Sequence, residues 1–284
     1  MWKRIERWSV WAFFCLFVSL PLRIVCLRYP PLARFVPGHQ SQNSKTKLKA
    51  GKVTLSERAS KALDEANGDI NYATQLLYSR DDVADARVKT WNAIAEFLPL
   101  SESQKLPERT EKRLQKIANA CTLGNDGRKV GRLLDVGCGN GLMLPYLKKS
   151  GLKLQTYTGI DISPVMIDQL SNKKAKGVCE DFATWHPEDF YDTILLNAVL
   201  QYTSDPLHVV RKAASIGKSI VIAHYQGRKF IRDEMRTMGE DKIKDMPSRE
   251  EVIATVGNDW VIDEKNSRNE HELDEFYLIK LAMK

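Results

Sequence analysis

The feature that most constrains this chain is a glycine-rich turn that follows a short apolar run. Residues 133–147 read LLDVGCGNGLMLPYL, so Gly137, Gly139 and Gly141 come soon after the acid Asp135. An apolar run that ends in such a turn is typical of a buried parallel strand that leads into a helix. Glycine has no Cβ atom, so the backbone can turn sharply and approach a ligand closely. The segment therefore predicts a loop that holds a nucleotide-like cofactor.

The spacing of the glycines indicates which cofactor is expected. A dinucleotide fingerprint is G-x-G-x-x-G/A, whereas this chain has G-x-G-x-G and then Leu142. The run D-V-G-C-G-N-G resembles motif I of the class I S-adenosylmethionine-dependent methyltransferases. An NAD or nucleotide-sugar enzyme on a similar sheet is the alternative, and Leu142 in place of the third small residue counts against it.

The next motif, YTGIDISPVMIDQL, follows at residues 157–170. Tyr157 to Ile160 predicts a second strand that ends at Asp161, 20 residues after Gly141. An acid at this strand end can accept hydrogen bonds from both ribose hydroxyls of an adenosine cofactor. Ser163 and Pro164 then predict the N-cap and first position of a helix.

Two further strand ends complete the predicted cofactor site. Residues 177–182 (GVCEDF) predict a third strand, and the resemblance implies that Asp181 meets the exocyclic amine of adenine while Phe182 flanks the ring. Residues 191–196 predict a fourth strand that ends at Asn197, and the resemblance implies that residues 197–202 lie beside the methionine part and the sulfonium. Each acid taken singly also fits an ordinary strand end, but their order within about 65 residues favours the cofactor. No metal site is predicted, and the predicted cofactor site is Asp135, Gly137, Cys138, Gly139, Gly141, Asp161, Ile162, Asp181, Phe182 and Asn197.

Three more strands are expected, at residues 219–223, 260–263 and 275–281. With the first four they predict an α/β fold, a doubly wound, seven-stranded, Rossmann-like methyltransferase sheet. Ligands bind such sheets at the carboxyl ends of the strands. We expect the S-adenosylmethionine-binding domain to span residues 126–284, and the resemblance covers about residues 110–284.

Residues 53–125 predict an N-terminal helical extension. Four helices are expected. The first begins at a capping box at Thr54 and ends near Ala66, and the others span residues 70–78, 83–98 and 108–121, with Pro99 ending the third. Methyltransferases often carry such helices as a lid over the cofactor and acceptor. Trp91 and Tyr78 are candidates to line that pocket, with ordinary packing against the sheet as the alternative.

Residues 1–52 predict a basic targeting or anchor segment and linker. Residues 9–22 form a stretch of 14 residues without a charge, a length that fits a signal-peptide core. If Arg23 snorkels, the apolar stretch extends to Leu27, which is long enough for a thin bilayer. Membrane association through residues 8–27 is therefore one expectation, with a signal anchor in the endoplasmic reticulum or secretory pathway. The basic, acid-poor composition also fits an address to a mitochondrion or plastid.

The charge distribution argues against a nucleic-acid partner. Residues 1–52 carry ten basic side chains and one acid, a charge of +9 within the total of +7. The remaining body is therefore slightly acidic, whereas nucleic-acid enzymes usually show a basic footprint on the folded domain. The five cysteines form no CxxC pair, so neither a disulfide framework nor a zinc site is expected.

The expected function is S-adenosylmethionine-dependent methyl transfer to a small-molecule acceptor. Asn197 is followed by Ala-Val, so the N/D-P-P-[YF] motif of enzymes that act on planar exocyclic amines is absent. His224 and Tyr202 are candidates for a general base. For His224 the favoured alternative is that it packs in the core as an ordinary histidine at a strand end. Two alternatives stay open: a non-catalytic S-adenosylmethionine-binding assembly or regulatory protein, and a lipid-like or quinone-like acceptor.

Overall fold

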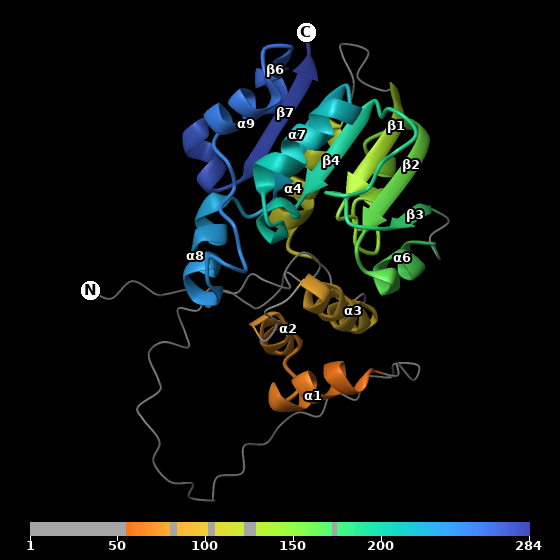
Figure 1. The fold of residues 1–284 in the computed structure, drawn as a ribbon, viewed down its shortest axis with the longest axis vertical. Helices are drawn as coiled ribbons and strands as arrows, with labels where there is room; N and C mark the ends of the chain where they lie inside the picture. The colour runs from red at the N-terminus through yellow and green to blue at the C-terminus, as the bar shows by residue number, and fades with distance from the viewer. Residues whose placement is uncertain (1–54, 80–83, 102–105, 122–128, 172–174) are drawn as a thin grey trace, which may run out of the picture.

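The structure is a computed structural model that describes residues 55–79, 84–101, 106–121, 129–171 and 175–284. Its elements alternate in the order expected for an α/β protein (Figure 1). The strands are β1 (Lys129–Val136), β2 (Lys153–Asp161), β3 (Lys176–Cys179), β4 (Thr193–Asn197), β5 (Ser219–His224), β6 (Trp260–Ile262) and β7 (Tyr277–Met283). The α-helices are α1 (Glu57–Glu65), α2 (Ile70–Ser79), α3 (Ala84–Ser101), α4 (Glu108–Ala120), α5 (Leu144–Lys149), α6 (Pro164–Ser171), α7 (Pro206–Ile216), α8 (Arg228–Met238) and α9 (Arg249–Val256). Short 3₁₀ helices include η1 (Leu200–Tyr202) and η3 (Glu270–Asp274).

The seven strands form one sheet in the order β3-β2-β1-β4-β5-β7-β6. Strands β1 to β5 are parallel, whereas β7 is antiparallel to both β5 and β6. The first strand, β1, therefore lies in the middle of the sheet, and the later strands are added outward on both sides of it. This confirms the predicted doubly wound, Rossmann-like architecture.

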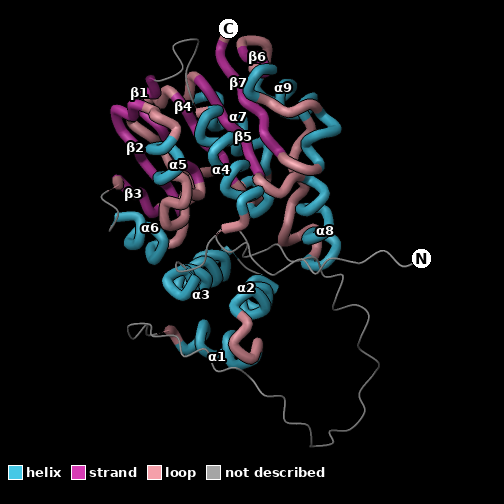
Figure 2. The backbone as a smooth tube through the Cα atoms, turned by 180° about the vertical axis from the view of Figure 1, so that it is seen from behind, coloured by secondary structure: helices cyan, strands magenta, loops and turns pink. Residues whose placement is uncertain are grey.

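Side chains of successive strand residues pack on opposite faces of the sheet. On β4, Leu195 packs with Ile117 of α4, while Ile194 and Leu196 pack with Val210 of α7. Helices α7 and α9 lie in front of the sheet in Figure 1, and α4 and α5 come forward in Figure 2. Both faces are thus covered, which explains why β4 and β5 are buried along their whole length.

Helices α1, α2 and α3 lie beyond the carboxyl ends of the parallel strands (Figures 1 and 2). Two hydrogen bonds connect α3 to α6 and to the residue just before it. Ser163 Oγ lies 2.7 Å from Asn92 Oδ1, and Gln169 Nε2 donates to the carbonyl of Ala95 at 2.9 Å. The helical extension therefore covers the edge of the sheet at which ligands are expected.

The expected start of α6 is confirmed, because the Ser163 hydroxyl accepts from the Met166 N–H at 3.2 Å. At the start of α9, Ser248 forms a capping box with Glu251. The first helix differs, because its N-cap is Ser56, whereas the expected cap Thr54 lies outside the described residues.

One expected helix end was wrong, and one helix was not expected. Helix α3 continues through Pro99 to Ser101. Pro99 lies in the last turn, where only two helical residues follow it, so its disruption of the helix is small. Helix α8 was not expected, because two of its three buried residues, Arg228 and Glu234, are charged and hide the apolar period. The boundaries expected near residues 52 and 125 fall outside the described residues, so they stay predictions.

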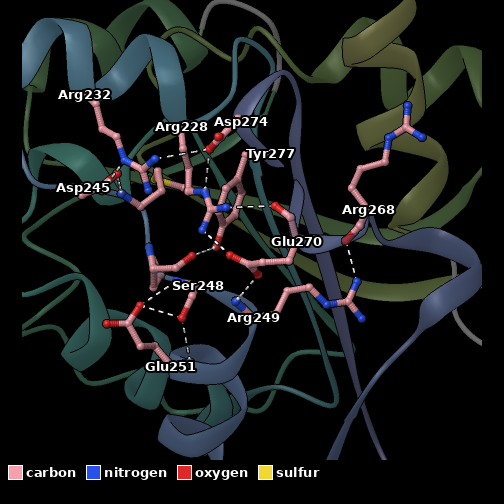
Figure 3. Close-up of polar contacts among 12 residues, drawn as sticks. Arg228, Arg232, Asp245, Ser248, Arg249, Glu251, Arg268, Glu270, Asp274 and Tyr277 are labelled. Carbon is pink, nitrogen blue, oxygen red and sulfur yellow. Dashed lines mark hydrogen bonds and ion pairs between the residues drawn. The ribbon is translucent and has the colours of Figure 1, made fainter. Parts of the chain in front are cut away.

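An arginine network, defined by Arg228, Arg232, Glu270 and Asp274, connects α8 to η3 (Figure 3). Arg228 has only 8% of its side chain exposed and forms ion pairs with both Glu270 and Asp274. Glu270 also accepts a hydrogen bond from the backbone N–H of Arg249 at the start of α9. The network therefore fixes α8 and α9 beside the C-terminal strand pair.

Replacing the buried arginine should destabilise the fold. We expect Arg228→Met to lower the free energy of unfolding by about 2 kcal/mol, because two carboxylates lose a charged hydrogen-bond donor. Urea unfolding measures this loss. Arg236→Met is the matched control, because Arg236 is 71% exposed and contacts Asp233 and the Arg232 carbonyl on its own helix, so we expect a change of about 0.5 kcal/mol or less. Equal losses in the two variants would contradict the role of the network.

Candidate functional site

One pocket lies at the carboxyl ends of β1, β2, β4 and β5, between the sheet and α3. Nine of the ten residues predicted for cofactor binding line it. The tenth, Gly141, does not line the pocket, and a Cβ atom at this position would come within 2.6 Å of Leu170 Cδ1. The base candidates His224 and Tyr202 also line the pocket. The nine lining residues are Asp135, Gly137, Cys138, Gly139, Asp161, Ile162, Asp181, Phe182 and Asn197.

The glycine loop after β1 needs glycine for two separate reasons. At Gly137 φ is +65°, and a Cβ atom would lie 2.4 Å from Val199 Cγ2. At Gly139 φ is +52°, a conformation that side chains disfavour, while a Cβ atom would make only an ordinary contact, 3.7 Å from Met166 Sδ. The first position thus permits close packing of the loop, and the second turns a backbone N–H toward Asp161.

Asp161 stands at the end of β2, and backbone donors hold its carboxylate. Gly139 N–H donates to Oδ2 at 3.0 Å, and Ser163 N–H donates to Oδ1 at 2.9 Å. A carboxylate oxygen can accept two hydrogen bonds, so each oxygen keeps capacity for a further donor such as a hydroxyl. The group is therefore oriented to accept hydrogen bonds from a vicinal diol.

Asp135 is buried at the end of β1 and plays a different part. Its carboxyl accepts a hydrogen bond from the Tyr157 hydroxyl at 2.7 Å. Burial raises the pKa of Asp135 to about 7, an effect that this hydrogen bond opposes. The acid is consequently divided between its neutral and ionised forms near pH 7.

Asp181 and Phe182 follow β3 at the other side of the pocket. The exposed carboxylate of Asp181 accepts a hydrogen bond from Ala183 N–H at 2.9 Å, which closes a tight turn. Phe182 is buried, and the ammonium of Lys212 lies 5.4 Å from the centre of its ring. Phe182 thus provides an apolar wall beside the Asp181 carboxylate, an arrangement that suits an adenine-sized ring.

Three buried amide side chains line the pocket, and each has an atom without a hydrogen-bond partner among the described residues. The atoms are Asn140 Nδ2, Asn197 Oδ1 and Gln201 Oε1. An unsatisfied buried polar atom costs about 1–3 kcal/mol, so such atoms need an explanation. Polar groups of the bound ligands, the cofactor or the acceptor, supply one, so the pocket as a whole fits an adenosine cofactor that carries an amino-acid tail.

His224 ends β5, and its ring is stacked between aromatic neighbours. The ring centres of Tyr225 and Phe230 lie 5.2 and 6.1 Å away and nearly parallel to it. Burial lowers the pKa of His224 to about 3, so the imidazole stays neutral at physiological pH. This environment supports packing more strongly than a role as general base.

Helix α3 supplies the upper wall of the pocket through Arg87, Trp91, Ile94 and Leu98. These residues share one helix face, because they follow each other at intervals of three or four. Trp91 makes an edge-to-face contact with Tyr202, with ring centres 5.0 Å apart. The side chain of the other lid candidate, Tyr78, lies outside the described part of the structure.

Sequence reasoning missed Asn140, Gln201 and Arg87 as separate lining residues. Among the described residues, no cluster of three or more His, Cys, Asp or Glu side chains could hold a metal ion. Within the same described residues, no helix is long and apolar enough to cross a membrane. Residues 8–27, for which membrane association is predicted, lie outside that described part.

The elevated pKa of Asp135 should make stability depend on pH. The folded carboxyl keeps its proton up to about pH 7, whereas the unfolded one releases it near pH 4, so ionisation costs folding free energy as pH rises between these values. We expect Asp135→Asn to remove this decline. Relative to the parent chain, the variant should gain about 2 kcal/mol between pH 5 and pH 7. Urea unfolding at both pH values measures the difference, and parallel curves for parent and variant would show that Asp135 titrates normally.

Comparison with known proteins places this pocket in a recognised domain. A family model described as a methyltransferase domain matches residues 104–239. Ubiquinone biosynthesis O-methyltransferase of Pseudoalteromonas translucida is 29% identical over an alignment of 137 residues, and the match covers 45% of this chain and 52% of the relative. 27-O-demethylrifamycin SV methyltransferase of Amycolatopsis mediterranei is 27% identical over an alignment of 124 residues, and the match covers 40% of this chain and 43% of the relative. The chain thus spans about half the length of these relatives.

Among solved structures, the complex between the Haloferax volcanii Trm112 methyltransferase activator and a putative methyltransferase matches with a TM-score of 0.53. The identity is 14%, and the match covers 69% of this chain and 96% of that one. A likeness at this identity shows the fold alone, and it agrees with the strand order described above. Residues 104–239 therefore match a methyltransferase domain, and the fold around them agrees with that of the class I S-adenosylmethionine-dependent methyltransferases, which the chain resembles.

Proposed function

We propose that this protein transfers the methyl group of S-adenosylmethionine to a small-molecule acceptor. The observation that carries the proposal is the Asp161 carboxylate, which Gly139 and Ser163 hold at the edge of the pocket with capacity for two hydroxyl donors. The matched methyltransferase domain and the O-methyltransferase relatives support the same activity.

The residues of the pocket divide the binding of the cofactor among them. Asp161 accepts hydrogen bonds from the ribose hydroxyls, Asp181 accepts one from the exocyclic amine of adenine, and Phe182 flanks the ring. The glycine loop lies against the amino-acid part, because Gly137 and Gly139 carry no side chain of their own that would stand between the backbone and the ligand. When bound, S-adenosylmethionine supplies an activated methyl group on a sulfonium.

The chain contributes alignment and exclusion of water rather than a strong base. Residues of α3 cover the pocket, and Trp91 and Tyr202 meet above it. Holding two reactants in line removes much of the entropic barrier to their reaction. His224 is neutral and buried, so it is poorly suited to removing a proton from the acceptor.

A lipid-like or quinone-like acceptor is the finer proposal. Apolar side chains contributed by several elements line the pocket beside the polar groups, and several relatives are named as O-methyltransferases of ubiquinone biosynthesis. The predicted membrane association through residues 8–27 would bring such an acceptor within reach. An address to an organelle remains the alternative for that segment.

The non-catalytic alternative, an assembly or regulatory protein, is separated from the enzyme by turnover. Extracts are incubated with the protein and S-adenosylmethionine that carries a tritiated methyl group. Transfer of label to a metabolite supports the enzyme. Tight cofactor binding without any labelled product supports the binding protein.

Asp161 should dominate cofactor affinity. We expect Asp161→Asn to weaken binding of S-adenosylhomocysteine at least tenfold, because the amide accepts fewer hydrogen bonds and carries no charge. Calorimetric titration of the full chain measures the affinity. Asp168→Asn is the control, because Asp168 is exposed on α6 and does not line the pocket. A change below threefold in a folded Asp161→Asn protein would remove Asp161 from the ribose site.

Crowding at Gly137 gives a second test of the cofactor loop. We expect Gly137→Ala to weaken S-adenosylhomocysteine binding more than tenfold, because its new methyl would displace Val199 and the loop with it. Gly151→Ala is matched for backbone strain, since Gly151 has φ of +73° with nothing within 4 Å of a Cβ atom. It should lose about 1–2 kcal/mol of stability and keep its affinity. Equal loss of affinity in both variants would point to general destabilisation.

A further inference from the structure

The floor of the pocket at the ends of β4 and β5 is built from three buried polar side chains. Asn197, Gln201 and His224 are 8%, 1% and 3% exposed, and all three line the pocket. Asn197 is paired with Ala223 across the two strands, so His224 lies beside it in the sheet. We call these three side chains the polar floor.

The orientation of Gln201 is fixed by two hydrogen bonds. Its Nε2 donates to the carbonyl of Ala198 at 3.1 Å, and its own backbone carbonyl accepts from Lys244 N–H at 2.8 Å. Ala198 adopts φ of +53°, which is uncommon for a residue with a side chain and concentrates strain in this turn. Since Nε2 is committed, Oε1 is the atom that stays buried without a partner.

The other two members of the polar floor offer complementary groups. Asn197 Oδ1 is also buried without a partner among the described residues, so the floor presents two hydrogen-bond acceptors. His224 Nδ1 accepts from Gln226 N–H at 3.3 Å, which places the proton of the neutral ring on Nε2. The floor therefore combines two amide oxygens with one N–H donor and carries no charge.

The strand order separates the polar floor from the ribose and adenine acids. Asp161 and Asp181 follow β2 and β3, whereas Asn197 and His224 end β4 and β5, on the opposite side of β1. A ligand whose adenosine lies against Asp161 and Asp181 directs its remaining atoms across β1 toward the floor. The polar floor therefore faces the place at which the methyl group is transferred.

We infer that the polar floor binds the nucleophile of the acceptor as a neutral hydroxyl or amine, with Gln201 Oε1 accepting its hydrogen bond. The inference rests on the proposed methyltransferase function and narrows its substrate class. Two unpaired amide oxygens attract an O–H or N–H donor and repel a carboxylate or thiolate. The acceptor's lone pair forms the bond to the methyl carbon, the carbon–sulfur bond breaks with its electron pair going to sulfur, and the acceptor's proton leaves to water.

The first experiment uses probes in place of the unidentified acceptor. The full chain, saturated with S-adenosylhomocysteine, is titrated with phenol, aniline, anisole and benzoate, and the side-chain amide of Gln201 is followed by NMR. We expect saturable shifts with phenol and aniline, and little or no shift with anisole, which lacks the donor, or with benzoate, which is an anion. Binding of benzoate at the floor, or absence of binding by both donor probes, would overturn the inference.

Variants establish that Gln201 itself accepts the hydrogen bond. Gln201→Met keeps the length of the side chain and removes the amide, so we expect phenol and aniline to bind about tenfold more weakly. Gln115→Met is the matched control, because Gln115 also has a buried unpaired amide oxygen but does not line the pocket. Unchanged probe affinity in a folded Gln201→Met protein would contradict the assignment.

A second source of donors is the ammonium group of the cofactor itself. Calorimetry with S-adenosylhomocysteine and with 5′-methylthioadenosine, which lacks that group, separates the two sources. We expect Gln201→Met to change both affinities by less than threefold. A tenfold loss confined to S-adenosylhomocysteine would overturn the inference and assign Gln201 to the cofactor. If the parent chain binds neither compound, the proposed function fails, and probe binding to the cofactor-free chain then judges the polar floor independently.

Discussion

The pocket depends on one carboxylate, that of Asp161, because it connects three parts of the fold. Gly139 N–H approaches it from the loop after β1, and Ser163 N–H approaches it from the cap of α6. Ser163 also contacts Asn92, which lies on α3 above the pocket. The cofactor loop, the strand end and the lid are therefore positioned relative to the same two oxygens, so a change at Asp161 reaches all of them.

The parts of this site that could be predicted from sequence are those that local patterns determine. An apolar run followed by glycines identifies the end of β1, and acids after apolar runs identify the ends of β2 and β3, because parallel strands place their carboxyl ends at one edge. Nine of ten predicted cofactor residues consequently line one pocket. Gly141 differs because its role is to let the loop pack on Leu170 rather than to face a ligand.

The parts that sequence reasoning missed depend on tertiary contacts. Gln201 lies in a 3₁₀ turn, where neither the strand nor the helix period indicates which way a side chain points. Its orientation comes from the positive φ of Ala198 and from Lys244, which is distant in sequence. Helix α8 was hidden because Arg228 is buried by acids of η3, a pairing that periodicity alone cannot reveal.

The electrostatics of the pocket favour a neutral nucleophile for a physical reason. Methyl transfer from a sulfonium to a neutral acceptor moves a positive charge from sulfur to the acceptor atom, whereas transfer to an anion abolishes that charge. Fixed dipoles aimed at the atom where charge develops stabilise the transition state without reorganising. Asn197 Oδ1 and Gln201 Oε1 present the negative ends of two such dipoles, and His224, kept neutral by burial, adds no opposing charge. An active site built for an anionic nucleophile would need the reverse arrangement, with donors or cations in place of these two amide oxygens.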